Sequence, residues 1–263
     1  MTAAPTLGHF GSSRLSRDTK NRFDTSGEQP QRRSAVMRRF EVVHLAPNGD
    51  IFDFARVAPA MEAFEEAFSA FARGTLFQTE DGPRAVEDLL PGDRVKTADR
   101  GFQPLIWKGS CSLIANIPEQ ASKMRSLTRV SADSLGFGRP GRDIVLGPSA
   151  RLFHSSEGVR TMTGRPTAVV PVRDFEDGVN IVDLTPQSAV QVYHLGFEEQ
   201  ERLLSDGIEL ESFHPGPAHR LPLRGDLLDL YLSFFPHIPD IMGFGAPRFP
   251  RLRLADLDLF SAA

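Results

Sequence analysis

The chain has 263 residues, 40% of them hydrophobic, which suits one large domain with extensions and a substantial buried core. The formal net charge is −4 and the Lys and Arg residues are spread out, which argues against a nucleic-acid partner and against an anionic membrane partner. Cys111 is the single cysteine, so an intramolecular disulfide and a CxxC metal pair are excluded.

The first 35 residues contain few large apolar side chains, so we expect residues 1–35 to be disordered. The basic stretch "QPQRRSAVMRR" is interpreted as a solvated linker rather than a nucleic-acid arm. No apolar h-region and no run of transmembrane length is visible, and a single cysteine fits a reducing compartment. We therefore expect a cytoplasmic protein, with leaderless export left open as an alternative.

Residues 36–72 are predicted to form a hairpin and a helix. In "RRFEVVHLAPNGDIFDFARV" apolar and polar residues alternate around Asn-Gly, a turn pair that favours positive φ at both positions. This predicts strands over 39–45 and 50–57. In "APAMEAFEEAFSAFARG" the aromatic residues fall at helical spacing, which predicts a helix from Pro59 to Ala72.

Residues 73–216 are predicted to form an all-β body of many short strands. Short apolar runs recur about every ten residues with Gly, Pro, Asp or Ser between them, as in sandwiches and barrels. The runs are "TLFQT", "RAV", "RVKTA", "GFQPLIWKGSCSL", "DIVLG", "RLFHS", "VRTMT", "AVVPV", "NIVDL", "AVQVYHL" and "IELESF".

Residues 217–263 are predicted to hold a C-terminal helix over about 225–235, followed by a tail interrupted by Pro and Gly. We expect the tail "FFPHIPDIMGFGAPRFPRL" to pack on the domain. The alternative is that it offers an apolar patch to an unknown protein partner.

Common catalytic motifs are absent from the sequence. The sequence holds no P-loop, GxGxxG, HExxH or GxSxG pattern, and "GFGRPG" is interpreted as a loop. His214 and His219 are too few ligands for zinc without a nearby Cys, so no metal and no cofactor are expected. His194 is interpreted as a hydrogen-bonded strand residue, and Cys111 as a small buried hydrophobe rather than a nucleophile.

Three segments together resemble the bacterial Hint family, the Hedgehog/intein type of autoprocessing domain, over about residues 68–216. They are "GTLFQTEDGPRAVEDLLPGDRVKTADRGFQPLIWKG", "DIVLGPSARLFH" and "VQVYHLGFEEQERLLSDGIELESFHPG". The resemblance implies a compact β-fold. It also implies that a Cys or Ser at the first residue attacks the carbonyl before it, assisted by a His in a Ser/Thr-Pro-x-His setting.

At the positions that match this pattern, the reacting groups are absent. "AFARGTL" places Ala70 at the nucleophile, and "LGPSARL" places Gly147 at the hydroxyl and Ala150 at the histidine. Gln200 stands where related members often carry another histidine. Alanine cannot form an ester, and neither alanine nor glutamine carries a proton near neutral pH.

Ser69, His154 and His214 are the candidate substitutes. Ser69 would attack the Phe68 carbonyl after a frame slip of one residue, but it falls inside the predicted helix. His154 is displaced along its strand, and His214 is expected to end a strand. We therefore predict a degenerate, non-catalytic Hint-type domain that serves as a binding or structural module. The alternative is an active domain that cuts near residues 69–71 by an N-to-O or N-to-S acyl shift.

Overall fold

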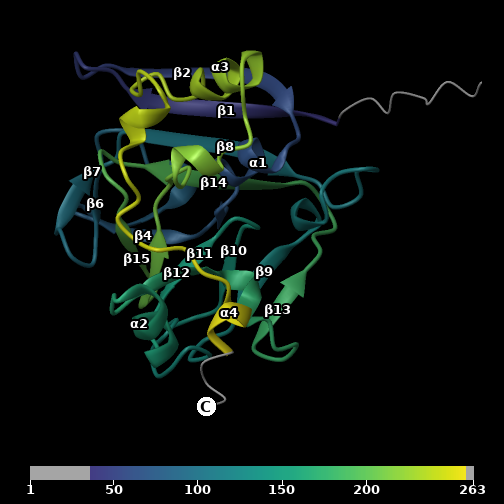
Figure 1. Cartoon of the computed structure of the whole chain (residues 1–263), viewed down its shortest axis with the longest axis vertical. Helices are drawn as coiled ribbons and strands as arrows, with labels where there is room; N and C mark the ends of the chain where they lie inside the picture. Colours follow the sequence, from purple (N-terminus) through teal and green to yellow (C-terminus); the bar gives the residue numbers. More distant parts are fainter. Residues whose placement is uncertain (1–35, 259–263) are drawn as a thin grey trace, which may run out of the picture. The chain divides into compact units, whose positions relative to one another are not determined.

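The computed structural model describes residues 36–258 and has the mainly β architecture that the short apolar runs predict. Its strands form antiparallel sheets of eight, four and four strands, with a few short helices (Figure 1). The predicted disorder of residues 1–35 concerns a segment outside the described residues.

The eight-stranded sheet has the order β13-β9-β10-β3-β14-β8-β1-β2. Its strands are β1 (Met37–Leu45), β2 (Ile51–Pro59), β3 (Phe71–Ala72), β8 (Trp107–Leu113), β9 (Leu127–Val130), β10 (Ile144–Leu146), β13 (Ile181–Leu184) and β14 (Val190–Gly196). The order puts the N-terminal hairpin at one edge. It puts β3, which directly follows the candidate reacting position, in the middle between β10 and β14.

Two four-stranded sheets complete the β-body, in the orders β12-β11-β16-β15 and β5-β4-β6-β7. Their strands are β4 (Leu76–Thr79), β5 (Gly82–Ala85), β6 (Arg94–Lys96), β7 (Phe102–Pro104), β11 (Arg151–His154), β12 (Ala168–Pro171), β15 (Arg202–Ser205) and β16 (Ile208–Glu211). The helices are α1 (Glu62–Glu66), α2 (Glu157–Thr163), α3 (Asp226–Leu232) and α4 (Leu254–Asp258). Among residues 36–258, no helix has the length and apolar character that crossing a bilayer requires.

The predicted N-terminal hairpin is confirmed. Strands β1 and β2 pair antiparallel from Met37 opposite Pro59 to Leu45 opposite Ile51. The turn differs in one respect, because only Gly49 has a positive φ, at +88°. The Asn48 side chain instead accepts a hydrogen bond of 3.1 Å from the Asp50 amide, which closes the turn without a left-handed asparagine.

The predicted helix over 59–72 is wrong in extent. Helix α1 ends at Glu66, and Phe71 and Ala72 form strand β3, which pairs with Tyr193 and Val192 of β14. The side chains at helical spacing are buried, as the pattern requires. However, a short helix followed by a strand buries the same side chains. Pairing in the central sheet therefore overrides local helix propensity at the end of this segment.

The predicted strand "VRTMT" is also wrong, because these residues lie in α2. The Ser156 hydroxyl caps the helix by accepting from the Val159 amide at 3.2 Å, and Gly164 ends it with φ +66°. An N-cap serine and a C-terminal glycine are the normal signals of a short helix. Strands β9 and β15, by contrast, form without having been predicted.

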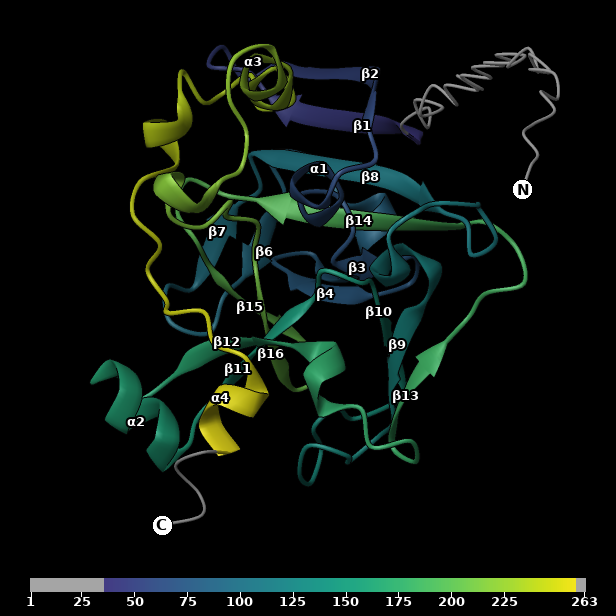
Figure 2. The same cartoon turned by 45° about the vertical axis from the view of Figure 1, so that its right-hand side comes forward.

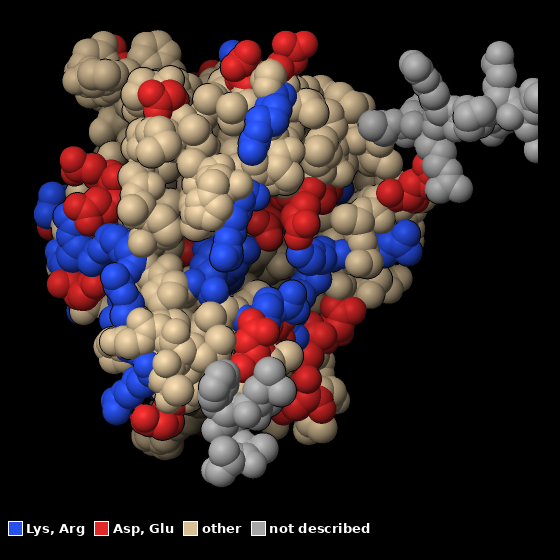
Figure 3. Space-filling view, in the orientation of Figure 1, with Lys and Arg blue, Asp and Glu red and all other residues tan. Residues whose placement is uncertain are grey.

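The C-terminal helix is confirmed as α3, and the tail after it packs on the β-body, as expected. Three tail arginines form ion pairs with acidic side chains of the body: Arg248 with Glu201, Arg251 with Glu211 and Arg253 with Asp174. In Figure 3, basic and acidic side chains are interleaved over this face rather than gathered by sign. The tail ends in α4, a helix that the Pro and Gly pattern did not predict.

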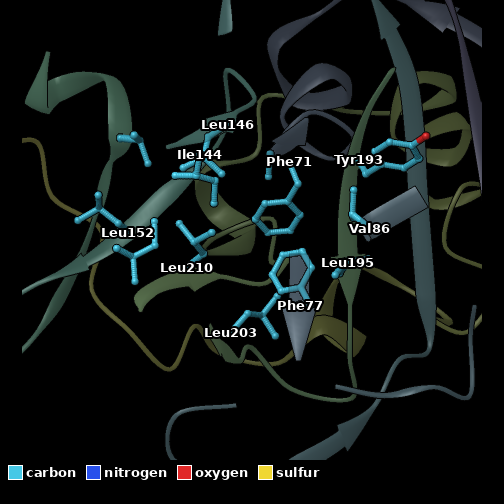
Figure 4. Close-up of a cluster of buried hydrophobic side chains, with 14 of the residues drawn as sticks. Phe71, Phe77, Val86, Ile144, Leu146, Leu152, Tyr193, Leu195, Leu203 and Leu210 are labelled. Carbon is cyan, nitrogen blue, oxygen red and sulfur yellow. The ribbon is translucent and has the colours of Figure 1, made fainter. Parts of the chain in front are cut away.

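The core has two main parts. In the first, β3, β4, β10, β11, β14, β15 and β16 contribute Phe71, Phe77, Leu146, Leu152, Leu195, Leu203 and Leu210, and Figure 4 shows Phe71 and Phe77 facing each other at its centre. We call the second part the aromatic cluster: Phe40, Phe64, Phe68, Trp107, Phe213, Tyr231, Phe234 and Phe235. Figure 2 shows α1 and α3 beside β1, β2, β8 and β14. The cluster joins these elements, because Phe64 of α1 contacts Tyr231 of α3 and Phe234.

Phe234, which follows α3, packs against the N-terminal hairpin and α1. Its ring is 5.7 Å from that of Phe40, 6.0 Å from Phe64 and 5.3 Å from Phe68. Its carbonyl accepts a 2.7 Å hydrogen bond from the Trp107 indole. Hairpin, α1 and α3 therefore share one core.

We predict that Phe234→Ala lowers the free energy of unfolding by about 3 to 5 kcal/mol, because it opens a cavity among packed rings. Urea unfolding followed by fluorescence measures the change. Phe137→Ala is the matched control, since Phe137 is fully exposed and its loss should cost less than about 0.5 kcal/mol. Equal effects of the two variants would contradict the central place of Phe234.

Candidate functional site

The Ser69–Ala70 junction lies between α1 and β3 and is held by backbone hydrogen bonds. The Ala70 amide donates to the Tyr193 carbonyl at 2.8 Å. The Gly147 amide donates to the Ala70 carbonyl, also at 2.8 Å. The prediction that Ser69 lies within a helix is therefore wrong, because α1 ends before the junction.

The Ser69 carbonyl is the group that a nucleophile at position 70 would attack. It accepts a 3.1 Å hydrogen bond from the Ser149 amide, a donor placed where charge would develop on the oxygen. It also lies directly over Gly147, because a Cβ at that position would be 2.1 Å from the Ser69 oxygen. Any side chain at position 147 is therefore incompatible with the present backbone.

Ala70 and Ala150 are both buried in the first core, at 1% and 2% exposure. The Ala150 amide donates to the Gly147 carbonyl at 3.1 Å, which forms a tight turn before β11. The structure thus brings together three of the four positions named from the sequence, and small side chains occupy the interior between them.

Gln200 is buried elsewhere and has structural partners. Its amide nitrogen donates to a carboxylate oxygen of Glu211. Its side-chain oxygen accepts from the backbone amides of Arg248 at 2.7 Å and Phe249 at 3.2 Å. Position 200 therefore anchors the C-terminal tail.

An ion-pair network connects the region of Gln200 with the junction. Glu211, 2% exposed, lies 3.0 Å from Arg251 and 3.6 Å from Arg151, the residue after Ala150. Arg151 also pairs with Glu66, at the end of α1, at 3.1 Å. These side chains hold α1, β11, β16 and the tail in register.

The Ser69 hydroxyl is buried and has two polar neighbours. It donates to the Glu65 carbonyl at 2.7 Å and lies 3.3 Å from the Ser149 hydroxyl. Neither group is a base at neutral pH, so nothing in this arrangement activates the hydroxyl.

A cavity of about 250 Å³ opens beside Ser69 and Ser149, lined mainly by α1 and the 121–124 turn. Ala70 and Ala150 do not line it and are buried in the first core, whereas Gln200 lines a separate, much smaller cavity together with Trp107 and His214. Burial raises the pKa of the Glu65 carboxyl at this cavity, although the Arg38 guanidinium, 3.2 Å away, opposes the shift.

The two histidine substitutes have partners of their own among the described residues, and neither Ser69 nor Ala70 is one of them. His154 packs against Phe175 at the end of β11, and burial lowers its pKa. His214 accepts from the Gly216 amide at 3.0 Å, and its other ring nitrogen lies 3.1 Å from the Phe244 carbonyl. Burial, followed by the nearby Arg251 guanidinium, lowers its pKa, so the ring is neutral and ties the tail to β16.

His194, on β14, packs against Phe71 of β3. Its ring centre is 5.4 Å from that of Phe71 and 5.3 Å from that of Phe213. Burial, assisted by Arg151 and Arg251, holds its pKa well below the usual value, so it does not carry a proton near neutral pH. Its Nδ1 accepts a hydrogen bond of 3.1 Å from the Leu195 amide, as predicted for a hydrogen-bonded strand residue.

Cys111 is buried on β8, as predicted, and its sulfur is 3.9 Å from the Phe68 carbonyl oxygen. Burial raises the pKa of this thiol to about 12. The thiolate needed for attack is therefore scarce at neutral pH.

The candidate zinc ligands do not converge. His214 uses both ring nitrogens on backbone groups, and His219 is exposed. Among residues 36–258, no three His, Cys, Asp or Glu side chains are grouped so that they could hold a metal ion.

Two residues at this site were missed by the sequence reasoning. Ser149, whose amide holds the Ser69 carbonyl, stands inside "LGPSARL" between two positions that were named, so its place in the motif was a usable signal. Glu211 opens "ESFHPG", but nothing in the local sequence indicates that it joins Gln200 to Arg151.

Comparison with known proteins finds a match to the family model described as Hint domain over residues 69–217, more than half of the chain. Two solved structures align with it, both with a TM-score of 0.38 over 55% of this chain and 98% of theirs. One is a bacterial intein-like domain from Clostridium thermocellum, 12% identical. The other is a splice-inactive variant of the AceL NrdHF class 3 split intein, 10% identical. No curated protein matches the sequence.

We predict that Gly147→Ala lowers the free energy of unfolding by about 1 to 3 kcal/mol, because the new methyl group meets the Ser69 carbonyl. Gly141→Ala is the matched control: its nearest neighbour is 4.0 Å away, so stability should hold or rise by up to about 1 kcal/mol. Urea denaturation of both variants measures the two changes in the free energy of unfolding. Similar values for the two would show that position 147 has room for a side chain.

We also predict that Cys111 in the folded chain reacts with a thiol reagent orders of magnitude more slowly than in urea, because it is buried and protonated at neutral pH. Labelling kinetics at pH 7 and 9 measure this. Rapid labelling of the folded chain at pH 7 would contradict the assignment of Cys111 as an inert core residue.

Proposed function

Because this chain belongs to the Hint domain family, we propose that it is a Hint domain that does not cleave itself and acts as a binding or structural module. Self-cleavage in such a domain needs a side-chain nucleophile next to the attacked carbonyl and a proton donor for the departing amide nitrogen. The proposal therefore depends on what surrounds the Ser69–Ala70 bond.

The observation that supports the proposal most strongly is that the Ser69 carbonyl is held in place while the next residue has no nucleophilic side chain. The Ser69 carbonyl has its amide donor from Ser149, at 3.1 Å. The residue that follows is Ala70, whose methyl group is buried in the core. No bond can form from this side chain to the carbonyl carbon, so the first step of an acyl shift has no starting group.

The place of the assisting histidine argues in the same direction. In the proposed function, Ala150 stands at the position of the assisting histidine. It packs in the same core as Ala70. The next residue, Arg151, forms ion pairs with Glu66 and Glu211. A proton for the leaving amide nitrogen therefore has no donor at this position.

The segment before the junction is built into the fold. Phe40, Phe64 and Phe68 are all fully buried in the aromatic cluster, and each contributes about 2 kcal/mol of burial free energy. A cut at the junction would leave this segment bound to the rest of the domain. That suits a permanent structural element better than a passenger to be released.

The rival is an active domain in which Ser69 attacks the Phe68 carbonyl and forms an ester. The Ser69 hydroxyl donates to the Glu65 carbonyl, so its proton is bound to an oxygen that is not a base at neutral pH. The Phe68 carbonyl oxygen lies near the protonated Cys111 thiol. This geometry favours the inert form over the rival.

We predict that the purified full-length chain keeps a single intact mass of 29.0 kDa on long incubation at neutral pH, with or without dithiothreitol or hydroxylamine. Denaturing mass spectrometry is required, because cleaved fragments would stay associated through the aromatic cluster. Hydroxylamine cleaves both esters and thioesters, whereas dithiothreitol cleaves thioesters alone. Fragments released by both reagents would therefore indicate a thioester, and fragments released only by hydroxylamine would indicate an ester.

Two fragments produced by a cut within residues 68–71 would overturn the proposal. Their masses would sum to the chain plus one water, or to the chain plus one molecule of the added reagent where that reagent opens the intermediate. Ser69→Ala is the control in that case. If it abolishes the fragments, the ester route through Ser69 is responsible, and if fragments persist, another nucleophile acts.

A further inference from the structure

Strand β2 is a long, exposed edge of the eight-stranded sheet. It pairs with β1 on one side, and no other strand among residues 36–258 pairs with it on the other. Its exposed residues include Ile51 at 46%, Phe52 at 51% and Val57 at 57%. A nine-residue edge with apolar side chains is a template for pairing with another strand.

The hairpin fixes which backbone groups face outward. The Ala46 amide donates to the Asp50 carbonyl at 2.8 Å, and the Ala60 amide donates to the Val36 carbonyl at 2.7 Å. Hydrogen-bonded pairs alternate in an antiparallel ladder, so the even-numbered residues between these ends bond to β1. The amides and carbonyls of Ile51, Asp53, Ala55 and Val57 therefore point away from the sheet, and all four residues are exposed.

We propose that β2 pairs antiparallel with β2 of a second copy of this chain, about a two-fold axis that passes through Phe54. The two large sheets then become one continuous sheet. In this register Ile51 bonds to Val57 of the second copy and Asp53 bonds to Ala55. Every outward amide and carbonyl of these four residues has a partner. The proposal is independent of whether the Ser69–Ala70 junction is chemically active.

The neighbouring registers are less favourable. Centring the pair on Ala55 places Pro59 opposite Ile51, and proline has no amide hydrogen to donate. Centring it on Asp53 places two aspartates directly opposite each other, and like charges in that position destabilise a strand pair. The register centred on Phe54 avoids both costs.

The side chains of β2 are also self-complementary in this register. On the outer face, the exposed Ile51 and Val57 meet as an apolar pair, once on each side of the axis. On the inner face, Arg56 meets Phe52 of the second copy, and cation–π contacts of this kind are favourable. Arg56 already lies 5.2 Å from the Phe54 ring within its own strand, so its guanidinium runs along this face. A copy of β2 therefore suits the edge in its apolar and cation–π contacts as well as in its backbone hydrogen bonds.

Sedimentation velocity of the full-length chain over a concentration series tests the proposal. We expect a reversible dimer with twice the 29.0 kDa monomer mass at the upper concentrations. A monomer at every concentration up to about 0.1 mM would overturn the proposal.

Ala55→Pro should weaken the dimer by about tenfold or more. It removes an outward amide at the pairing edge and fills its place with the proline ring. The ladder to β1 keeps all its bonds, because Ala55 does not bond to β1. Ala55→Thr keeps the amide and serves as the control, with a dimer constant near that of the unmodified chain. A dimer unaffected by proline would place the interface elsewhere.

A charge exchange tests the register without relying on proline. Val57→Lys, at an exposed position, should weaken the dimer, because Lys replaces an apolar partner of Ile51. Ile51→Glu combined with Val57→Lys should strengthen it again relative to Val57→Lys alone, because opposite charges then meet twice across the axis. Failure of the double variant to recover the dimer would overturn this register, and circular dichroism confirms that each variant is folded.

Discussion

The packing of the Phe234 ring against Phe40, Phe64 and Phe68 holds the segments on either side of the Hint body in one core. Aromatic side chains bury large areas and are constrained in geometry, so this cluster also fixes the angles of hairpin, α1 and α3. The family model covers residues 69–217. Phe40, Phe64, Phe68 and Phe234 come from outside that range and are as deeply buried as any residue within it.

This shared core limits what the junction can do. In the proposed function, the chain from the hairpin to α1 is the first layer of the domain. Arg38 reinforces the connection, because its guanidinium lies 3.2 Å from buried Glu65 and joins β1 to α1. Removing one partner of such a buried pair leaves an uncompensated charge, so β1 and α1 depend on each other. A released passenger would have no reason to carry such a pair.

Local sequence patterns predicted the fold well where a pattern is compatible with only one kind of secondary structure. The alternation around Asn48 and Gly49 led directly to β1 and β2. The pattern from Met61 to Phe71 did not lead to α1 and β3, because a helix and a helix–strand pair bury the same residues. Only pairing with β14, more than a hundred residues away, decides between them. Ser156 and Gly164 are residue types that mark the two ends of a helix. The strand prediction for "VRTMT" followed the short apolar run between them and was therefore wrong.

The candidate site was predictable as a set of positions but not as a set of contacts. Motif order indicated Ala70, Gly147 and Ala150, which lie together. The contact between the Ser149 amide and the Ser69 carbonyl joins residues 80 positions apart, and no local pattern encodes it. The same holds for Gln200, whose partners Glu211 and Arg248 come from β16 and the tail.

In the proposed function, each position that the family resemblance assigns to the reaction has a structural contact of its own. Gly147 lets the Ser69 carbonyl approach, Ala150 fills the core beside Ala70, and Gln200 anchors the tail. These contacts are coupled, because Arg151 connects α1 to Glu211, and Glu211 bonds to Gln200. Coupled contacts are not additive, so a catalytic side chain introduced at one position would also disturb the contacts made at the others. In the proposed function, the absent nucleophile at position 70 is therefore one part of a site whose packing, backbone approach and ion pairs all serve the fold.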